Sequence, residues 1–443
     1  MNNQKVYEVK KLNICDDTQS VIRKVVAPGS KSITNRALLL AALSDRKCVL
    51  EGALFSDDSR YFAKALIELG FEVELDEEKR IAVIKGENGI VPKKQAKIYV
   101  GSAGTAARFL TAMLGFSDGE YVIEASEQMK KRPMKPLFDV LEYMGADIEC
   151  LEEEGCLPIR IKGMSVPKTC DISLDISKST QFLSAILMTA RMLQKDVHIE
   201  ITSDKKTGSY IEITRKVMKD FGIDSELDGK VYTVKNISRA GGHTMVAENE
   251  FSYYIEPDVS AASYFYAAAM ICGFTVQVKG VYEDVMQGDI KFVKLLEKMG
   301  GKIIPHNDGI IFEGAKNGEY NGVELNMNDF SDQALTLAAV ATYAKTPTVI
   351  TGISHIRGQE CDRVAAIANE LNKAGIFCEE TEDGVKIIPG KAEPAIIETY
   401  DDHRVAMAFT LLGLKTEGIK ILNPSCTRKT FENYFDEFEK LYI

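Results

Sequence analysis

The feature that most constrains this fold is an internal repeat of about 75 residues. Five stretches have the pattern of an amphipathic helix that ends on a glycine, the residue that favours the last turn of a helix. These glycines, spaced 75, 77, 78 and 75 residues apart, are Gly70, Gly145, Gly222, Gly300 and Gly375. A fixed period of this length predicts one supersecondary unit that the chain uses several times.

Each predicted repeat holds two helices and four strands. After each glycine come two short alternating runs around a turn, such as 71–75 and 81–84, which predict a β-hairpin. About 40 residues before each glycine, a polar loop opens into an Ala/Leu-rich helix, and a sixth such opening lies at 401–403. The sequence therefore predicts an α/β fold of six β-α-β-α-β-β units.

The two ends of the chain predict a discontinuous lobe. The sixth unit stops at Ile443 without a closing hairpin, whereas residues 1–27 hold two strand-like runs, 5–12 and 21–26, and no helix. We therefore expect residues 1–27 to complete the last unit. The predicted lobes, with three repeats each, are 28–256 and 1–27 plus 257–443. A small-molecule site is expected in the cleft between two such lobes.

Composition excludes several classes of partner. The 443 residues carry a formal net charge of −11, which disfavours nucleic acid and anionic membranes. No apolar run approaches the roughly 20 residues that span a bilayer, and the polar amino terminus does not resemble a secretory signal, so we expect a cytoplasmic protein. Nine cysteines, including Cys15, form no CxxC pair, and five histidines, including His243, are dispersed. We expect reduced thiols, no metal and no cofactor.

In the first lobe, the predicted helix starts carry groups that bind anions. The segment 28–36 (PGSKSITNR) places Lys31 and Arg36 at a helix amino terminus, where backbone amides favour negative charge. It is not a Walker A loop, because Ser30 and Val25 stand where that loop needs glycine. Similar helix starts or cationic loops follow at 101–108 (GSAGTAAR), 129–136 (MKKRPMKP) and 177–181 (SKSTQ). Alternatively, each segment is only a helix cap or a solvated turn.

The second lobe adds carboxylates beside cations. Asp332 and Glu360 are candidates for proton transfer, and Arg363 and Arg404 suit bidentate binding of a carboxylate. Alternatively, the carboxylates cap helices and pair with neighbouring arginines, and His403 is a buried core histidine. If all six helix starts face one cleft, they concentrate positive potential there despite the net negative charge. The sequence thus predicts an enzyme that acts on phosphorylated carboxylic acids.

Seven ordered segments over about 400 residues resemble the 5-enolpyruvylshikimate-3-phosphate synthase family. They are PGSKSITNR (28–36), GSAGTAAR (101–108), KRP (131–133), STQF (179–182), MQGDI (286–290), DDHR (401–404) and CTRKTF (426–431). The resemblance implies a two-lobe enolpyruvyl-transferase fold, an inside-out α/β barrel. It also implies transfer of the carboxyvinyl group of phosphoenolpyruvate to the 5-hydroxyl of shikimate 3-phosphate, through a tetrahedral adduct that releases phosphate. Neither a cofactor nor a covalent enzyme intermediate is implied.

The resemblance also implies roles for individual residues. Asp332 would accept the proton of the 5-hydroxyl, and Glu360 or Lys31 would help to protonate the methylene carbon. Shikimate 3-phosphate would be held by Lys31, Ser32, Arg36, Ser179, Thr180, Gln181, Thr207 or Lys206, Tyr210, Asp332, His355 and Gln359. Phosphoenolpyruvate would be held by Lys31, Gly104, Arg132, Gln181, Arg363, Arg404 and Lys429.

Three departures from the family pattern affect the acceptor side. Gln359 stands where the family commonly has lysine, His355 where asparagine is frequent, and 207–210 (TGSY) replaces a Ser-Arg/Lys-Pro-Tyr segment. These departures put the reaction rate and the substrate affinity in doubt more than the identity of the reaction. His355 or Arg357 could restore the positive charge that is missing at Gln359.

Two alternatives to this function stay open. One is a UDP-N-acetylglucosamine enolpyruvyl transferase, although 125–132 lacks the reactive cysteine of that family. The other is a non-catalytic sensor with the same fold, which the loss of a cation at Gln359 makes conceivable. Because the two lobes would form a self-contained cleft, we expect a monomer.

Overall fold

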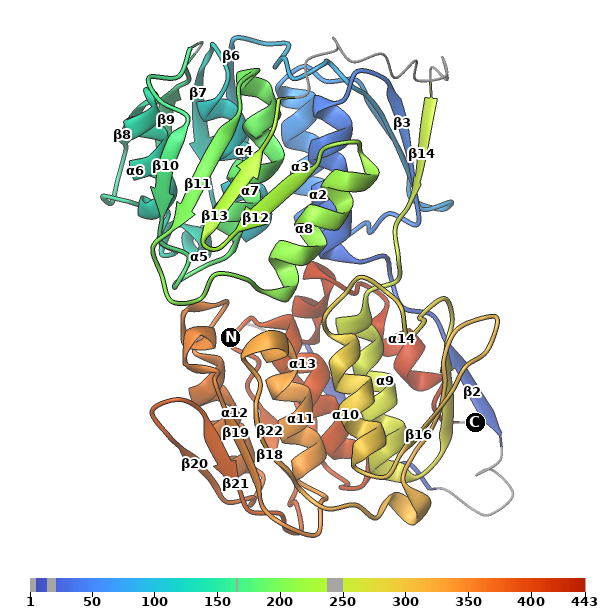
Figure 1. Ribbon diagram of the computed structural model, residues 1–443. Helices are drawn as coiled ribbons and strands as arrows, with labels where there is room; N and C mark the ends of the chain where they lie inside the picture. The colour runs from blue at the N-terminus through green and yellow to red at the C-terminus, as the bar shows by residue number, and fades with distance from the viewer. Residues whose placement is uncertain (1–4, 14–20, 165, 237–249, 443) are drawn as a thin grey trace. The chain divides into compact units, whose positions relative to one another are not determined.

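The computed structural model describes residues 5–13, 21–164, 166–236 and 250–442 (Figure 1). Cys15 and His243 lie outside these residues. The chain divides into two compact units, which we call the amino-terminal unit (Gly29–Ile255) and the discontinuous unit (Met1–Pro28 with Glu256–Ile443). Among the described residues, no helix is both long and apolar enough to cross a membrane.

The amino-terminal unit has three four-stranded sheets in its described residues. The first sheet has the order β14 (Glu250–Tyr254), β3 (Lys47–Glu51), β5 (Ile81–Lys85), β4 (Val73–Asp76). The second has the order β6 (Gln95–Tyr99), β7 (Glu120–Glu124), β9 (Ile159–Lys162), β8 (Asp147–Cys150). The third has the order β10 (Asp171–Leu174), β11 (Val197–Ile201), β13 (Val231–Val234), β12 (Ser225–Asp228). In each sheet the first two strands are parallel and the remaining pairs are antiparallel.

Two kinds of helix cover these sheets. The apolar helices α2 (Lys31–Leu43), α4 (Gly104–Gly115) and α7 (Gln181–Thr189) are almost fully buried and pack against one another (Figure 1). The amphipathic helices bury one face each; they are α3 (Asp57–Glu68), α6 (Lys135–Met144) and α8 (Ser209–Asp220). The short helices are α5 (Glu127–Lys130) and the 3-10 helix η1 (Ala190–Leu193). Because α2, α4 and α7 are apolar on all sides, they form the core and their polar first turns lie at its end.

The discontinuous unit repeats this pattern in its described residues. Its first sheet has the order β2 (Ile22–Val25), β15 (Thr275–Val278), β17 (Ile311–Glu313), β16 (Lys302–Ile304). The second has the order β18 (Glu324–Asn326), β19 (Thr348–Thr351), β21 (Val385–Ile387), β20 (Cys378–Glu380). The third has only β22 (Ile396–Ile397), β23 (Lys420–Leu422) and β1 (Val6–Glu8).

The helices of the discontinuous unit also fall into two kinds. The buried core helices are α9 (Val259–Cys272), α11 (Ala334–Ala341) and α13 (His403–Thr410). The outer helices are α10 (Ile290–Lys298), α12 (Arg363–Lys373) and α14 (Tyr434–Glu439). The 3-10 helices are η2 (Lys316–Gly318), η3 (Asn328–Gln333), η4 (Ser354–Gly358), η5 (Leu411–Leu414) and η6 (Pro424–Lys429).

The first strands of repeats 1 and 4 are exchanged between the units. Strand β2 precedes α2 in sequence but pairs with β15, and β14 precedes α9 but pairs with β3. The expectation that 21–26 completes the last repeat is therefore wrong, whereas β1 does join that repeat, as the third strand of its sheet, by pairing with β23. A strand's own alternation fixes which face is buried and leaves open which sheet the strand joins, so the sequence could not assign β2.

Candidate active site

A network of alternating charges lies in the discontinuous unit, with Arg363 at its centre. Arg363 is the first residue of α12 and its side chain is only 1% exposed. Its guanidinium donates to Asp332 Oδ1 at 3.1 Å, to Glu360 Oε2 at 2.8 Å and to Asp402 Oδ2 at 2.8 Å. Three carboxylates around one buried cation form a buried charge network rather than a solvated surface pair.

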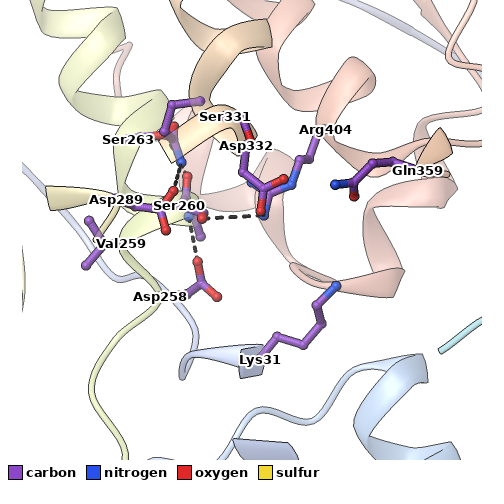
Figure 2. Close-up of polar contacts among 12 residues, drawn as sticks. Lys31, Asp258, Val259, Ser260, Ser263, Asp289, Ser331, Asp332, Gln359 and Arg404 are labelled. Carbon is purple, nitrogen blue, oxygen red and sulfur yellow. Dashed lines mark hydrogen bonds and ion pairs between the residues drawn. The ribbon is translucent and has the colours of Figure 1, made fainter. Parts of the chain in front are cut away.

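Two further cations extend this network. Arg404 Nη2 donates to Asp332 Oδ2 at 3.0 Å, so that Asp332 bridges Arg363 and Arg404 (Figure 2). Lys429 Nζ lies 3.0 Å from Glu360 Oε1, so that Glu360 bridges Arg363 and Lys429. The network therefore places two bridging carboxylates among three cations, the arrangement that proton transfer beside bound anions requires.

Local structure explains how distant segments reach this network. Asp402 is the N-cap of α13 and accepts from the backbone N–H of Arg404 at 2.8 Å. Asp332 lies in η3 immediately before α11, and Lys429 ends η6. Asp332 and Asp402 thus stand just before the core helices α11 and α13, where unsatisfied backbone N–H groups favour negative charge, and Lys429 stands at the end of a short 3-10 turn.

Burial and neighbouring charges shift the ionisation of this region. Burial alone lowers the pKa of Arg363, but the carboxylates of Asp402, Glu360 and Asp332 outweigh burial, and the pKa is raised. Asp289 accepts from Gln333 Nε2 at 2.9 Å, and burial, followed by the charge of Asp332, raises the pKa of Asp289 to about 6. A carboxyl with a raised pKa beside a second carboxyl is typical of acid–base sites.

In the amino-terminal unit, Arg36 is a buried cation among uncharged acceptors. It donates from Nε to Thr214 Oγ1 at 2.8 Å, and from its other nitrogens to backbone oxygens of Ser32 at 2.8 Å and Tyr210 at 3.2 Å. Burial lowers the pKa of Arg36 to about 10. Because no ion pair to Arg36 occurs in the described residues, this guanidinium is suited to an anionic ligand.

The starts of α2, α3 and α4 meet in the same unit. Lys31 Nζ lies 3.5 Å from Asp58 Oδ2, in the first turn of α3. Asn35 donates to Thr105 Oγ1 at 2.6 Å and so joins α2 to α4. At Gly104, an added Cβ would lie 2.6 Å from Arg108 Nη1 and 2.8 Å from Arg132 Nη1. Glycine therefore lets two guanidinium groups approach the amino terminus of α4, as a phosphate site needs.

The third repeat supplies neutral polar groups at the start of α7. Ser179 Oγ accepts from the backbone N–H of Gln181 at 3.2 Å, and Thr180 is the N-cap of α7. Thr207 is exposed, whereas Tyr210 is half-buried in the first turn of α8. Hydroxyls at a helix amino terminus can bind phosphate oxygens without adding charge.

Two of the three departures from the family pattern, Gln359 and His355, lie beside the charge network. Gln359 Oε1 accepts from Arg363 Nη1 at 3.3 Å, and His355 Nε2 lies 2.8 Å from Ser331 Oγ, next to Asp332. Arg357 Nη1 is 2.9 Å from Glu380 and 3.1 Å from Asp362, so its charge is already paired with two carboxylates.

Metal ligands and reactive thiols are not evident in the part of the chain that the structure describes. No group of three or more His, Cys, Asp or Glu side chains there could hold a metal ion. The eight described cysteines are free, and burial, followed by the charge of Asp402, raises the pKa of the Cys361 thiol. A raised thiol pKa disfavours the nucleophilic thiolate.

Comparison with known proteins decides the family. Residues 16–438 match the family model for EPSP synthase (3-phosphoshikimate 1-carboxyvinyltransferase). The chain belongs to this family. The EPSP synthase-family enzyme named 3-phosphoshikimate 1-carboxyvinyltransferase from Trichormus variabilis is 42% identical over 418 residues, 94% of this chain and 96% of the relative. A protein of that name from Yersinia pestis is 40% identical over 416 residues, 94% of this chain and 95% of the relative.

Solved structures show the fold of the EPSP synthase family in this chain. EPSP synthase from Acinetobacter baumannii superposes with a TM-score of 0.79 at 23% identity, over 99% of this chain and 98% of that chain. The enolpyruvyl transferase NikO from Streptomyces tendae gives a TM-score of 0.70 at 14% identity, over 98% and 97%. The family resemblance and the two-lobe enolpyruvyl-transferase fold expected from the sequence are confirmed.

Within each unit, the structure brings several predicted EPSP synthase residues together. One set, in the discontinuous unit, is Asp332, Gln359, Glu360, Arg363, Arg404 and Lys429. Another, in the amino-terminal unit, joins Ser32, Arg36 and Tyr210 through the Arg36 guanidinium, and Gly104 to Arg132. That the two sets serve one pair of substrates stays a prediction.

Sequence reasoning missed three acidic residues that support these sets. Asp402 contacts Arg363, Asp289 is coupled to Asp332, and Asp58 pairs with Lys31. Asp402 and Asp289 lie inside the DDHR and MQGDI segments that carry the family resemblance, so the signal was present without a role attached. Asp58 has no such signal, because its partner is 27 residues away in another element.

Proposed function

We propose that this chain transfers the carboxyvinyl group of phosphoenolpyruvate to the 5-hydroxyl of shikimate 3-phosphate and releases phosphate. The reaction is a step of the shikimate pathway to aromatic amino acids. Membership of the EPSP synthase family supports this function. The structural observation that best supports this reaction is the network in which Asp332 and Glu360 bridge Arg363, Arg404 and Lys429.

In the proposed addition step, Asp332 takes the proton of the 5-hydroxyl, and the oxygen attacks C2 of phosphoenolpyruvate. The methylene carbon C3 receives a proton from Glu360 or Lys31, which yields a tetrahedral adduct. In the elimination step, C3 loses a proton, the C2–O bond to phosphate breaks, and the enol ether and inorganic phosphate form. Atoms and charge balance without a cofactor, and general acid–base catalysis by positioned carboxylates supplies both proton transfers.

The donor is assigned to arginine and lysine side chains. Arg363 and Arg404 would hold the carboxylate of phosphoenolpyruvate, because paired guanidinium groups match a planar carboxylate. Lys31, Arg132 and Lys429 would hold its phosphate, together with the backbone at Gly104. The close approach of Arg108 and Arg132 to Gly104 supports the phosphate assignment.

The acceptor is assigned mainly to the amino-terminal unit. Ser32 and Arg36 would bind the shikimate carboxylate, and the burial of Arg36 among uncharged hydrogen-bond acceptors supports this role. Ser179, Thr180 and Thr207 would bind the 3-phosphate, with Gln181 and Tyr210 beside the ring. Gln359 and His355 would contact the hydroxyl side, and Gln359→Lys is expected to preserve or raise turnover.

The test of this function is phosphate release by the purified full chain with phosphoenolpyruvate and one of two acceptors. Release with shikimate 3-phosphate and not with UDP-N-acetylglucosamine is the expected result. Asp332→Asn should abolish it, whereas Asp329→Asn, an exposed neighbour paired with Lys291, should not. Release only with the sugar nucleotide would overturn the acceptor. Binding of both shikimate-pathway ligands without release would indicate the sensor instead. Cytoplasmic location and a monomeric state stay predictions.

A further inference from the structure

The Asp332 carboxylate occupies the arginine pair that the proposed function assigns to the donor's carboxylate. One oxygen, Oδ1, lies 3.1 Å from Arg363 Nη1, and the other, Oδ2, lies 3.0 Å from Arg404 Nη2. A carboxylate that gives one oxygen to each of two guanidinium groups has the geometry expected for a substrate carboxylate at the same place. Figure 2 shows Asp332 and Arg404 side by side, with Gln359 next to them.

Arg363 has no donor left for a substrate. A guanidinium has five N–H groups. Those of Arg363 point to Asp402 Oδ2 at 2.8 Å and Oδ1 at 3.4 Å, Glu360 Oε2 at 2.8 Å, Asp332 Oδ1 at 3.1 Å and Gln359 Oε1 at 3.3 Å. An incoming carboxylate can therefore contact Arg363 only if one of these acceptors moves away.

The acceptors on Nη1 are the ones that can leave. Asp402 is fully buried and caps α13, and Glu360 accepts from the other terminal nitrogen, Nη2. Asp332 and Gln359, by contrast, share Nη1 of Arg363. The Asp332 side chain is also the most exposed of the three carboxylates on Arg363, at 13% against 8% for Glu360 and 0% for Asp402.

We propose that the carboxylate of phosphoenolpyruvate displaces Asp332 from Arg363 and Arg404, so that binding of the donor releases the base. The proposal rests on the proposed function. A carboxylate held by two guanidinium groups is a poor proton acceptor, and its release makes it a better one. The neighbouring Asp289 acts in the same direction, since repulsion between two nearby carboxylates favours proton uptake. Donor binding and activation of the base would thus be one event.

The test compares donor affinity of the wild-type chain and Asp332→Asn by calorimetry, without acceptor. Asparagine keeps the shape of aspartate but carries no charge, so it does not compete with the donor's carboxylate for Arg363 and Arg404. We expect phosphoenolpyruvate to bind the variant about tenfold more tightly, which corresponds to about 1.4 kcal/mol, while turnover with shikimate 3-phosphate is lost. A residue that acts only as a base would leave donor affinity unchanged.

A second ligand separates displacement from a general change of charge. Ethyl phosphate has a phosphate and no carboxylate, so displacement predicts the same affinity for the wild-type chain and Asp332→Asn. An equal gain for both ligands, or no gain for phosphoenolpyruvate, would overturn the proposal. A wild-type chain that neither binds phosphoenolpyruvate nor turns over would overturn the proposed function itself and this inference with it. If thermal unfolding shows that Asp332→Asn is not folded, Asp332→Ser removes the same carboxylate and takes its place.

Discussion

Asp402 lies behind both arginines that we assign to the donor's carboxylate. It accepts from Arg363 Nε at 2.8 Å and from the backbone of Arg404 at 2.8 Å. In Asp402→Asn, the amide oxygen can accept from only one of these two donors, Arg363 Nε or the Arg404 backbone N–H. The amide NH2 group then faces the other donor, and that hydrogen bond is lost. Because hydrogen bonds to charged groups contribute roughly 1.5–3 kcal/mol, we expect the KM for phosphoenolpyruvate to rise at least about tenfold. Steady-state kinetics with each substrate varied in turn measure this.

The matched control for Asp402→Asn is Asp362→Asn. Asp362 is also an N-cap, and it accepts from the backbone N–H of Ala365 at 3.0 Å, but it is exposed and pairs with Arg357 rather than Arg363. Its KM values should stay near wild type. If Asp402→Asn only lowers thermal stability and leaves the KM for phosphoenolpyruvate unchanged, Asp402 has a purely structural role and the prediction is wrong.

At the scale of single residues, the sequence selected charged side chains that the structure brings together, but it did not predict what each of them contacts. Motif matching selected Asp332, Glu360, Arg363, Arg404 and Lys429, and these form one network. It could not show that Asp332 bridges two arginines from segments 31 and 72 residues away. Such contacts depend on tertiary packing, which no local pattern encodes.

At the scale of elements, the start of α4 shows how a glycine makes room for charge. A Cβ added at Gly104 would lie within 3 Å of guanidinium nitrogens of Arg108 and Arg132, which are the flexible ends of long side chains. In Gly104→Ala the arginines would move, while the helix itself persists because alanine favours helix. We expect the KM for phosphoenolpyruvate to rise by about tenfold with little change in the thermal midpoint, as measured by kinetics and thermal unfolding.

The control for Gly104→Ala is Gly390→Ala. The nearest neighbour of a Cβ at Gly390 is Ile376 Cδ1 at 3.5 Å, an ordinary van der Waals distance. This variant should match wild type in both KM values. A Gly104→Ala enzyme with an unchanged KM for phosphoenolpyruvate would remove the start of α4 from the proposed phosphate site.

The repeat predicted most of the helices and strands, but it did not predict all of the strand pairings. The five glycines that mark the period all have positive φ and follow the last residue of α3, α6, α8, α10 or α12 within two positions. At Gly145, for example, φ is +123° and the backbone N–H closes the helix on Glu142. The predicted lobes placed β2 and β14 in the correct units, but the sheet that β2 joins was not predictable, because its alternation indicates a buried face and not a partner strand.

At the scale of the whole molecule, Asp289 makes stability depend on pH. Its pKa is raised from 3.8 to about 6, chiefly by burial. A carboxyl with a raised folded-state pKa contributes stability that is fully present below about pH 4 and is lost as the pH rises through about 6. Asp289→Asn has no charge to bury and still offers an oxygen to Gln333. We expect it to be more stable than wild type at pH 8, by on the order of 2 kcal/mol, and equally stable near pH 4.

Urea unfolding of both proteins across this pH range measures the difference. The control is Asp284→Asn, an exposed carboxyl in the same loop before α10, which should follow the wild-type profile throughout. If the difference between Asp289→Asn and wild type does not change between pH 4 and pH 8, Asp289 does not titrate in this range and the prediction fails.

The proposed carboxyvinyl transfer can be followed directly by phosphorus NMR. The purified full chain is mixed with equal amounts of phosphoenolpyruvate and shikimate 3-phosphate, and all phosphorus signals are followed over time. We expect both substrate signals to decline together while inorganic phosphate and one new phosphate monoester appear in equal amounts. Inorganic phosphate without a new ester, or two unchanged substrates beside an intact fold, would contradict it.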